Sequence, residues 1–341
     1  MRAVVFHEHG GLDKLHVEDV PRPEPAAGEV LVQIKAAALN HLDVHTRRGI
    51  PGFKLPLPHI GGCDGAGLVS AHGAGVTAPR IGARVAINPL LVDGTCEFCV
   101  GGDESLCPRI RLLGEHVTGT FAEFAVVPAR NLLAMPDAMS FETAAAVPLV
   151  YQTAWRMMRR ARVSAGEDVL VLGASGGVAS AAIQLARHLG ARVLAAAGGA
   201  EKLARAQALG AEVLIDSSKE DVARRVREVT GKRGVDVVID HVGKATYQAA
   251  IRSLRRGGRM VVCGATTGND PPAELHYIFW NQLEVIGSTM ASFAETAEVW
   301  RLVCDGKVAP VIDSVLPLAS CAEGQRRLEA REHFGKIVLS V

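Results

Sequence analysis

The sequence has no long apolar run and no marked excess of charge of either sign. Nowhere do about 18 apolar residues follow one another, the length that a membrane-spanning helix needs. The 37 lysines and arginines balance 36 aspartates and glutamates, which argues against a nucleic-acid-binding surface and against an acidic disordered tail. Residues 1–6 lack the apolar stretch and cleavage site of a signal peptide. We therefore expect a cytoplasmic protein that binds neither membranes nor nucleic acid.

Internal repeats and low-complexity segments are also absent. At 341 residues the chain exceeds the usual size of one domain, so two domains are expected. The hydrophobic share of 48% and charged share of 21% are those of an ordinary globular enzyme. The seven cysteines are an odd number, and three of them lie within residues 96–107. In a reducing compartment such a cluster favours a metal over disulfides.

The pattern of the chain changes near residue 140. Before it, short alternating runs separated by turn clusters predict strands at residues 15–20, 29–37, 67–71, 84–87 and 121–127. After it, helix-period segments alternate with β-branched runs at residues 168–172, 192–196, 213–215, 235–239, 259–263 and 283–286. This alternation is typical of an α/β fold with a doubly wound parallel sheet. Residues 335–339 predict one more strand.

A predicted strand, a glycine-rich turn and an apolar helix follow one another at residues 169–188. Gly176 and Gly177 lack the side chains that would hold a pyrophosphate away, and the helix N-terminus offers N–H groups and a positive dipole end. The motif is imperfect because Ala174 and Ala179 stand where glycine is usual. The alternative is a glycine turn that serves only the packing of the strand against the helix, but the βαβ context favours a dinucleotide site.

The residues just after the predicted strand at 192–196 indicate which nicotinamide cofactor is bound. Neither Ala197 nor Gly198 is the acid that would accept a hydrogen bond from the ribose 2′-hydroxyl of NAD, and Lys202 follows closely. A missing acid and a nearby cation favour a 2′-phosphate. We therefore predict NADP(H) rather than NAD(H). The alternative is that Lys202 is a solvated surface charge and Glu201 binds the ribose.

Residues 92–109 predict a zinc lobe. Asp93, Cys96, Cys99 and Cys107 are spaced by three, three and eight residues. Three thiolates and a carboxylate suit Zn²⁺, and a closed shell of four ligands is structural rather than catalytic. Two alternatives stay open: thiols without a metal, and another ligand or water in place of Asp93.

These features together resemble the medium-chain dehydrogenase/reductase superfamily along essentially the whole chain. Residues 62–67, the cysteine lobe, residues 119–124, the Thr153-Ala154 pair and residues 335–338 follow that family's order. The resemblance implies a GroES-like β-barrel catalytic domain from residues 1–126 and 306–341, and a Rossmann domain from residues 127–305. It also implies an active-site cleft at their junction. The lobe resembles that of the zinc alcohol dehydrogenases, with Asp93 in place of their first lobe cysteine.

The positions of the catalytic zinc ligands depart from those enzymes. Where they have a cysteine and then a Gly-His-Glu turn, this chain has Asn40 and then Gly62-Cys63-Asp64. Leu42 replaces the hydroxyl residue that relays the proton. A catalytic zinc needs three protein ligands and an open position. Asn40 instead resembles the asparagine of the quinone-reductase branch, which works without a metal.

The resemblance therefore implies hydride transfer from NADPH to a quinone or an α,β-unsaturated carbonyl, with a structural zinc and no standard catalytic zinc. In this hypothesis Asn40 holds the substrate carbonyl, His45 donates a proton and Cys63 lies at the site. The expected cofactor contacts are His41, Thr153, Gly176, Gly177, Val178, Gly198, Lys202 and Gly264.

Two other functions stay open. The first is an alcohol dehydrogenase whose catalytic metal shell is rearranged among His41, His45, His59, Cys63, Asp64, Glu115 and His116. The second is a cofactor-binding protein without turnover. The resemblance also implies a homodimer or homotetramer paired through the Rossmann sheet edge near residues 284–287.

Overall fold

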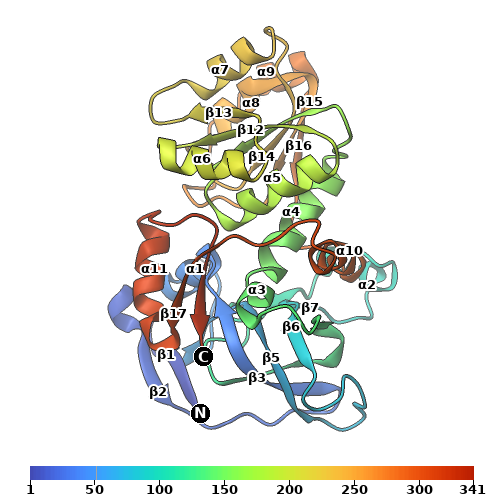
Figure 1. Ribbon diagram of the computed structural model, residues 1–341, viewed down its shortest axis with the longest axis vertical. Helices are drawn as coiled ribbons and strands as arrows, with labels where there is room; N and C mark the ends of the chain where they lie inside the picture. Colours follow the sequence, from blue (N-terminus) through green and yellow to red (C-terminus); the bar gives the residue numbers. More distant parts are fainter. Residues whose placement is uncertain (51) are drawn as a thin grey trace. The chain divides into compact units, whose positions relative to one another are not determined.

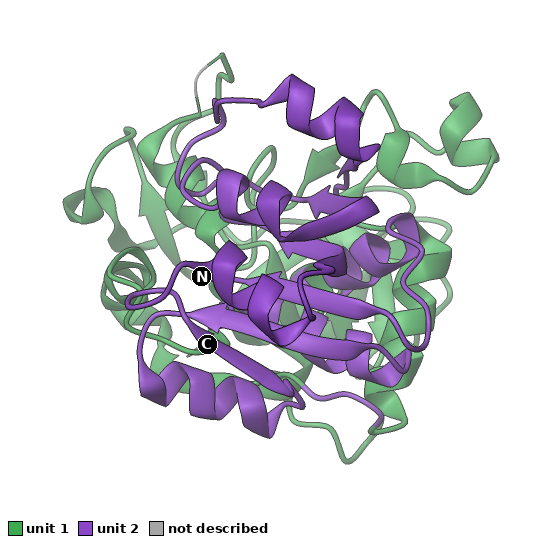
Figure 2. Ribbon diagram, turned by 90° about the horizontal axis from the view of Figure 1, so that it is seen from above, with its two compact units in different colours: residues 1–149, 291–306, 310–341 green, residues 150–290, 307–309 purple. Residues whose placement is uncertain are grey.

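The computed structural model describes residues 1–50 and 52–341. The chain forms two compact units, coloured separately in Figure 2. Unit 1 comprises Met1–Leu149, Ala291–Gly306 and Pro310–Val341, and unit 2 comprises Val150–Met290 and Lys307–Ala309. Among the helices of the described residues, none is both long and apolar enough to cross a membrane.

The boundaries of these units differ from the predicted domain boundaries, which lie between residues 126 and 127 and between residues 305 and 306. Strand β9 (Phe124–Pro128) runs across residue 126 and pairs with β3, so the chain stays in unit 1 beyond that point. Helix α10 (Phe293–Cys304) also belongs to unit 1. The indole Nε1 of Trp300 on this helix donates to Ala134 O at 2.9 Å, which ties the helix to the end of strand β10.

The predicted doubly wound parallel sheet is confirmed in unit 2. Its strands lie in the order β13-β12-β11-β14-β15-β16, and each pairs in parallel with its neighbours. Apart from Asp168, Asp236 and Asp240, the residues of the central strands β11 and β14 are β-branched residues or leucines, and these are buried, as a sheet covered on both sides requires. The strands are β11 (Asp168–Leu172), β12 (Arg192–Ala197), β13 (Val213–Asp216), β14 (Val235–Asp240), β15 (Leu254–Val262) and β16 (Glu284–Gly287).

Helices cover both faces of this sheet (Figure 1): α5 and α6 lie on one face, and α7, α8 and α9 on the other. The strand order reverses between β11 and β14, and sheets of this kind bind their ligands at the carboxyl ends of the strands at that point. The helices of this region are α4 (Pro148–Arg160), α5 (Gly177–His188), α6 (Ala200–Ala208), α7 (Val222–Val229), α8 (Tyr247–Ser253) and α9 (Leu275–Asn281).

The β-sheets of unit 1 combine both ends of the chain. Strand β18 pairs with β3 in the antiparallel direction, with Val338 opposite Ala38, so the last strand completes a sheet begun near the N-terminus. That sheet follows the order β10-β6-β5-β3-β18-β17, and β9 also pairs with β3. Its strands are β3 (Glu29–Ala38), β5 (Asp64–His72), β6 (Arg84–Ile87), β9, β10 (Leu132–Ala134), β17 (Ile312–Pro317) and β18 (Lys336–Ser340).

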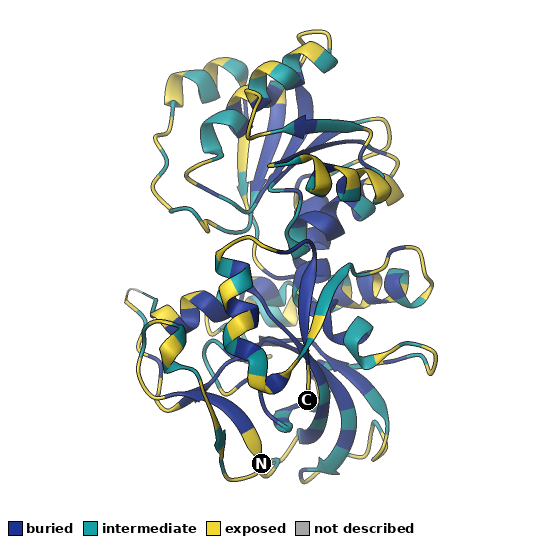
Figure 3. Cartoon of the chain, turned by 60° about the vertical axis from the view of Figure 1, so that its left-hand side comes forward, coloured by how far each residue is buried: buried dark blue, intermediate teal, exposed yellow. Residues whose placement is uncertain are grey.

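Smaller elements complete unit 1, and within each unit the strands form the buried interior while helix outer faces are exposed (Figure 3). Strands β1 (Arg2–Phe6), β2 (His16–Asp19) and β4 (His59–Ile60) form one sheet, and β7 (Leu90–Leu91) pairs with β8 (Arg111–Leu112). The helices are α1 (His41–Arg48), α2 (Glu97–Val100), α3 (Phe141–Ala145), α10 and α11 (Cys321–Glu329).

Candidate functional site

A buried lysine of β18, Lys336, lies at the centre of a polar network in unit 1. Its ammonium group donates to Leu39 O at 2.8 Å and to Asn40 Oδ1 at 2.6 Å. It also pairs with Asp64 Oδ2 at 3.0 Å, and the two side chains are 3% and 0% exposed. The other oxygen of Asp64 accepts the Leu149 N–H at 2.8 Å. Because the ammonium group has three acceptors and both carboxylate oxygens have donors, the buried charges are compensated.

The network gives the Asn40 side chain hydrogen-bond partners within unit 1. Its amide Nδ2 donates to Asp64 Oδ2 at 2.9 Å and to Ala38 O at 3.3 Å, so both amide hydrogens have acceptors. An amide offers two hydrogens, so a hydrogen bond from Asn40 to a substrate carbonyl, which stays a prediction, would have to replace one of these. In this structure the Asn40 side chain joins β3, β5 and β18.

A second buried carboxylate, Asp43, fixes the turn that precedes Cys63. Its oxygens accept the Asn40 N–H at 2.7 Å and the Gly62 N–H at 3.2 Å. Burial raises the pKa of Asp43 to about 7, against the opposing effects of these hydrogen bonds and of the Lys336 charge. Cys63 is itself fully buried, and burial together with nearby carboxylates raises the pKa of its thiol.

Glu115 lies beside the Cys63 turn because two backbone segments interlock there. Gly114 has a φ of 75°, and a Cβ at this position would lie 2.3 Å from Gly62 O, so only glycine permits the approach. Downstream, the Thr120 N–H donates to Gly62 O at 2.9 Å. Burial raises the pKa of the Glu115 carboxyl to about 7.

The residues considered for a rearranged metal shell do not assemble one in residues 1–50 and 52–341. Among these described residues, one group brings three or more possible ligand atoms of His, Cys, Asp or Glu together. None of the residues considered for the rearranged shell belongs to that group. His59 Nε2 instead lies 3.0 Å from Gly114 O, and the ring of His41 is 6.1 Å from that of His333. His45 is exposed on α1, and partial burial and the Arg48 charge lower its pKa.

The group that does assemble is the predicted lobe. The ligand atoms of Asp93, Cys96, Cys99 and Cys107 all lie within 4.8 Å of one another. Zn–S bonds of about 2.3 Å in a tetrahedron place the sulfurs on the order of 3.8 Å apart, so a small contraction would close a shell. Asp93 Oδ2 faces Cys107 Sγ at 3.3 Å and also accepts from Arg109 Nε at 2.8 Å. The donor set thus fits zinc.

In unit 2 the glycine turn forms a cradle at the carboxyl end of β11. Gly173 has a φ of 60°, and a Cβ there would lie 2.8 Å from the Val242 side chain. Gly176 caps α5 without a side chain, and a Cβ on it would lie 3.2 Å from His241 Nε2. The buried Nδ1 of His241 has no hydrogen-bond partner among the described residues. A bare helix N-terminus beside an unsatisfied imidazole fits a pyrophosphate or ribose ligand.

The predicted 2′-phosphate position lies in the turn after β12. Gly198 is exposed and Lys202 is half-buried at the start of α6. An acid at the end of β13, Asp216, accepts three hydrogen bonds on Oδ1, from Gly199 N, Ser218 N and Ser218 Oγ. These bonds hold the pKa of Asp216 down, to about 2. Asp216 therefore fixes the turn, and the sequence reasoning had missed it.

The other predicted cofactor residues fall in both units. Gly177 and Val178 begin α5, and Gly264 follows β15 with its Cβ position 3.2 Å from His241 O. Thr153 is buried within α4. The structure thus gathers Gly176, Gly177, Val178 and Gly264 at one edge of the Rossmann sheet. His41 lies in unit 1, and its cofactor contact stays a prediction.

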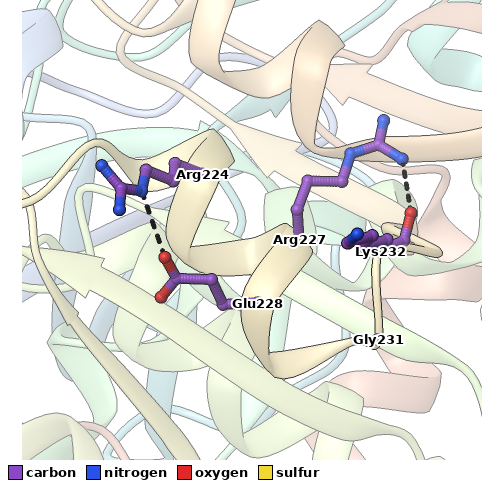
Figure 4. A pocket seen from close by; sticks show the side chains of 5 residues that line it. All are labelled: Arg224, Arg227, Glu228, Gly231 and Lys232. Carbon is purple, nitrogen blue, oxygen red and sulfur yellow. Dashed lines mark hydrogen bonds and ion pairs between the residues drawn. The ribbon is translucent and has the colours of Figure 1, made fainter.

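A hollow on unit 2 is lined by Arg224, Arg227, Glu228, Gly231 and Lys232 (Figure 4). Arg224 Nε pairs with Glu228 at 3.1 Å, and Arg227 donates to Lys232 O at 3.0 Å. Since these two guanidinium groups have partners and no catalytic group lines the hollow, we assign it no role.

Besides Asp216, three residues of these sites escaped the sequence analysis as functional groups. Lys336 lies in residues 335–338, which were used only for the family resemblance. A lysine next to apolar strand residues was the signal that could have identified it. Glu115 was considered only as a metal ligand. His241 directly follows a predicted strand of the parallel sheet, at the edge where ligands bind, which was a usable signal.

Comparisons with known proteins match this geometry. Residues 26–137 match the family described as the alcohol dehydrogenase GroES-like domain, and residues 177–305 match the zinc-binding dehydrogenase family. An alcohol dehydrogenase of Schizosaccharomyces pombe is 32% identical over 341 residues, covering 99% of this chain and 97% of that protein. An acryloyl-coenzyme A reductase of Metallosphaera sedula is 32% identical and is covered in full.

A solved structure of an NAD-dependent alcohol dehydrogenase superposes with a TM-score of 0.97 at 48% identity, with 100% of both chains covered. Together with the two family matches, this likeness confirms the predicted fold class, a GroES-like domain and a Rossmann sheet.

The raised pKa of Glu115 predicts a pH dependence of stability. Its side chain is 12% exposed, and its pKa is 4.5 in a model peptide and about 7 in the folded chain. The neutral carboxyl of Glu115 makes its full contribution to the free energy of unfolding below about pH 4.5, and this contribution is lost as the pH rises through about 7. At about 1.4 kcal/mol per pKa unit, the free energy of unfolding falls by about 3 kcal/mol over this range.

Urea unfolding of the wild type and of Glu115→Gln at several pH values measures this loss. The free energy of unfolding of the wild type should fall relative to the variant between pH 5 and 8. Parallel curves over that range would contradict the assignment.

Proposed function

This chain belongs to the medium-chain dehydrogenase/reductase superfamily, and from this premise we propose that it reduces a quinone or an α,β-unsaturated carbonyl compound with NADPH. The family matches and relatives make it an NAD(P)H-dependent oxidoreductase. The acryloyl-coenzyme A reductase relative acts, by its name, on an enoyl thioester, which is such an unsaturated carbonyl. We place an enoyl thioester or enone first among the substrates.

The observation that carries the proposal is the network of Lys336, Asn40 and Asp64. The position of the family's cysteine ligand is taken by an amide that is hydrogen-bonded to a buried ion pair. An alcohol is oxidised by these enzymes through a Lewis acid, whereas a conjugated double bond is already polarised toward hydride. A site organised by hydrogen bonds suits the second reaction better.

The residues of the chain have distinct roles in this proposal. When bound, NADPH supplies the hydride. Gly173 and Gly176 leave room for its pyrophosphate, and the N-terminus of α5 with His241 offers it donors. Lys336 and Asp64 hold Asn40, which we propose lies at the substrate site.

Alcohol oxidation is the second candidate. The names of the Schizosaccharomyces pombe relative and of the structure at 48% identity favour it. It would require Cys63 and two further residues to move together around a metal, because those side chains do not converge in the described residues.

An assay of cofactor oxidation separates the two candidates. We expect NADPH to be oxidised with a panel of enones, short trans-2-enoyl thioesters and quinones, and NADP⁺ to be reduced only slowly with primary and secondary alcohols. Alcohol oxidation that is lost in Cys63→Ala and in metal-depleted protein would overturn the proposal.

The preference for NADP(H) rests on Lys202 and on the absence of an acid at positions 197 and 198. Removing a cation from a 2′-phosphate costs about 1.5–3 kcal/mol. Lys202→Ala should therefore raise the KM for NADPH roughly 10- to 100-fold and leave the KM for NADH nearly unchanged.

Glu201→Ala is the matched variant on the neighbouring position. If Glu201 binds the ribose of NAD(H) instead, this variant loses affinity for NADH, and Lys202→Ala affects both cofactors equally. Initial rates with both cofactors at saturating acceptor decide between these results.

We propose that Asp93, Cys96, Cys99 and Cys107 hold a structural zinc. Elemental analysis of protein purified without added zinc should give about one zinc per chain, because a closed four-ligand shell holds its metal tightly. Cys96→Ala/Cys99→Ala should lose this metal and lower the thermal stability. Cys304→Ala, a thiol outside the lobe, is the control, and its loss of zinc would contradict the site.

The chain is proposed to form a homodimer or homotetramer through β16. This strand is the edge of its sheet, and an unpaired edge can pair with a second copy. Val285 on the strand and Phe279 and Trp280 on α9 are large exposed apolar side chains of the same unit.

A further inference from the structure

We propose that His241 binds one defined half of the cofactor: its Nε2–H donates a hydrogen bond to the ribose phosphate that carries the nicotinamide. The inference rests on the proposed function for its nicotinamide cofactor and deepens it by assigning a single side-chain atom to a single part of that molecule. The residues that carry it all lie in unit 2.

His241 lies where the strand order of the parallel sheet reverses. It is the first residue after β14, and the glycine turn that begins at Gly173 follows β11, the strand paired with β14. In a doubly wound sheet a dinucleotide binds across this point, with one nucleotide on each half of the sheet. The half formed by β11, β12 and β13 contains the turn that we expect to hold the adenosine, at Gly198 and Lys202. Since His241 belongs to the other half, it faces the nicotinamide nucleotide.

The imidazole ring of His241 lies against the glycine turn with its Cε1–Nε2 edge. A Cβ at Gly173 would lie 3.3 Å from both of these ring atoms, and a Cβ at Gly176 would lie 3.2 Å from Nε2. Gly176 is the N-cap of α5, a helix of 12 residues, and the N–H groups at such a helix end bind phosphate. Nε2 therefore lies beside the position at which α5 would hold a phosphate group.

The two ring nitrogens of His241 have different surroundings. Nδ1 is sealed from solvent and has no hydrogen-bond partner among the described residues. Nε2 has no partner among them either, but it is not one of the sealed atoms. A hydrogen on Nδ1 would be a buried donor without an acceptor, which is costly, whereas a hydrogen on Nε2 can reach a ligand. The neutral ring therefore carries its hydrogen on Nε2 and presents this atom as a donor.

The titratable groups around His241 agree with a neutral ring. Burial lowers the pKa of His241, against the charge of Asp240. Asp240 is engaged in its own turn, because Oδ1 accepts the Val242 N–H at 2.7 Å and both oxygens lie 3.0 Å from the Thr246 hydroxyl. Burial raises the pKa of the neighbouring Cys263 thiol to about 12, so this group is also uncharged.

The backbone that presents His241 is held by the loop after β15. The Thr267 N–H and hydroxyl both donate to Val242 O, at 2.9 and 2.7 Å. Gly243 has a φ of 89°, and a Cβ there would lie 2.7 Å from Gly268 O, so glycine is required for this approach of the two loops. Because the loop is already ordered, little entropy is lost when Nε2 meets a ligand.

The test measures the binding of three probes by calorimetry. NADPH and 2′-phospho-ADP-ribose contain the ribose phosphate in question, and 2′,5′-ADP lacks it. His241→Asn removes the donor at the Nε2 position, whereas the longer side chain of His241→Gln restores an N–H donor near it. His241→Asn should weaken the binding of the first two probes roughly 10- to 100-fold, because a hydrogen bond to a charged group is lost. Its binding of 2′,5′-ADP should stay within about twofold of the wild type, and His241→Gln should bind all three within about threefold.

His188→Asn is the matched control, because His188 is an exposed histidine at the opposite end of α5. This variant should bind all three probes as the wild type does. The same series with NADH, ADP-ribose and AMP repeats the comparison without the 2′-phosphate, so the result does not depend on which cofactor the protein prefers.

Nuclear magnetic resonance gives a readout that a merely structural effect would not produce. In long-range ¹H–¹⁵N correlation spectra of histidine-labelled protein, the signals absent from His241→Gln identify His241. They should show the hydrogen on Nε2. Addition of 2′-phospho-ADP-ribose should shift the Nε2 signal more than the Nδ1 signal.

Unchanged NADPH binding by His241→Asn would overturn the inference, as would an equal loss for 2′,5′-ADP or a hydrogen on Nδ1. If the wild type binds the cofactor but reduces no enone, enoyl thioester or quinone, the proposed reaction fails while the binding series still measures the His241 contact. If the wild type binds neither NADPH nor NADH, the cofactor role fails and the contact fails with it. The two failures are therefore distinguishable.

Discussion

The buried ion pair of Lys336 and Asp64 is the constraint on which unit 1 depends. It joins residues that are 272 positions apart and brings the last strand onto the sheet begun by β3. Removing one partner of such a pair leaves an uncompensated charge, which costs about 3–5 kcal/mol. Because Asn40 is held by both partners, the position of its side chain and the closure of the sheet depend on the same ion pair. A zinc ligand at position 40 would have to break this network.

The fold was predictable because local pattern and topology agree. Strands β6 and β11 were predicted to the residue, since their apolar runs are bounded by turn residues on both sides. Strand β15 begins at Leu254, five residues before the predicted start, because Arg255, Arg256 and two glycines conceal it. There a sheet neighbour, Val235, pairs with Leu254 and overrides the weak local preference.

The grouping of the candidate site residues was predictable where it depends on spacing along the chain. The lobe thiols and the glycine turn are local, and the structure brings each set together. The roles of Lys336 and Glu115 depend instead on burial and on contacts between distant segments. Glu24 is an exposed side chain, whereas burial raises the pKa of the Glu115 carboxyl, and only the surroundings distinguish these two glutamates.

The carboxyl groups around the Cys63 turn show how partners and burial act against each other within one small region. Asp64 has a lysine and two N–H groups as donors. Asp43 accepts two backbone N–H groups, yet burial raises its pKa to about 7, and burial raises the pKa of Glu115 to about 7 as well. An ion pair with further donors compensates a buried charge, whereas at Asp43 and Glu115 burial outweighs the available partners and favours the protonated acid.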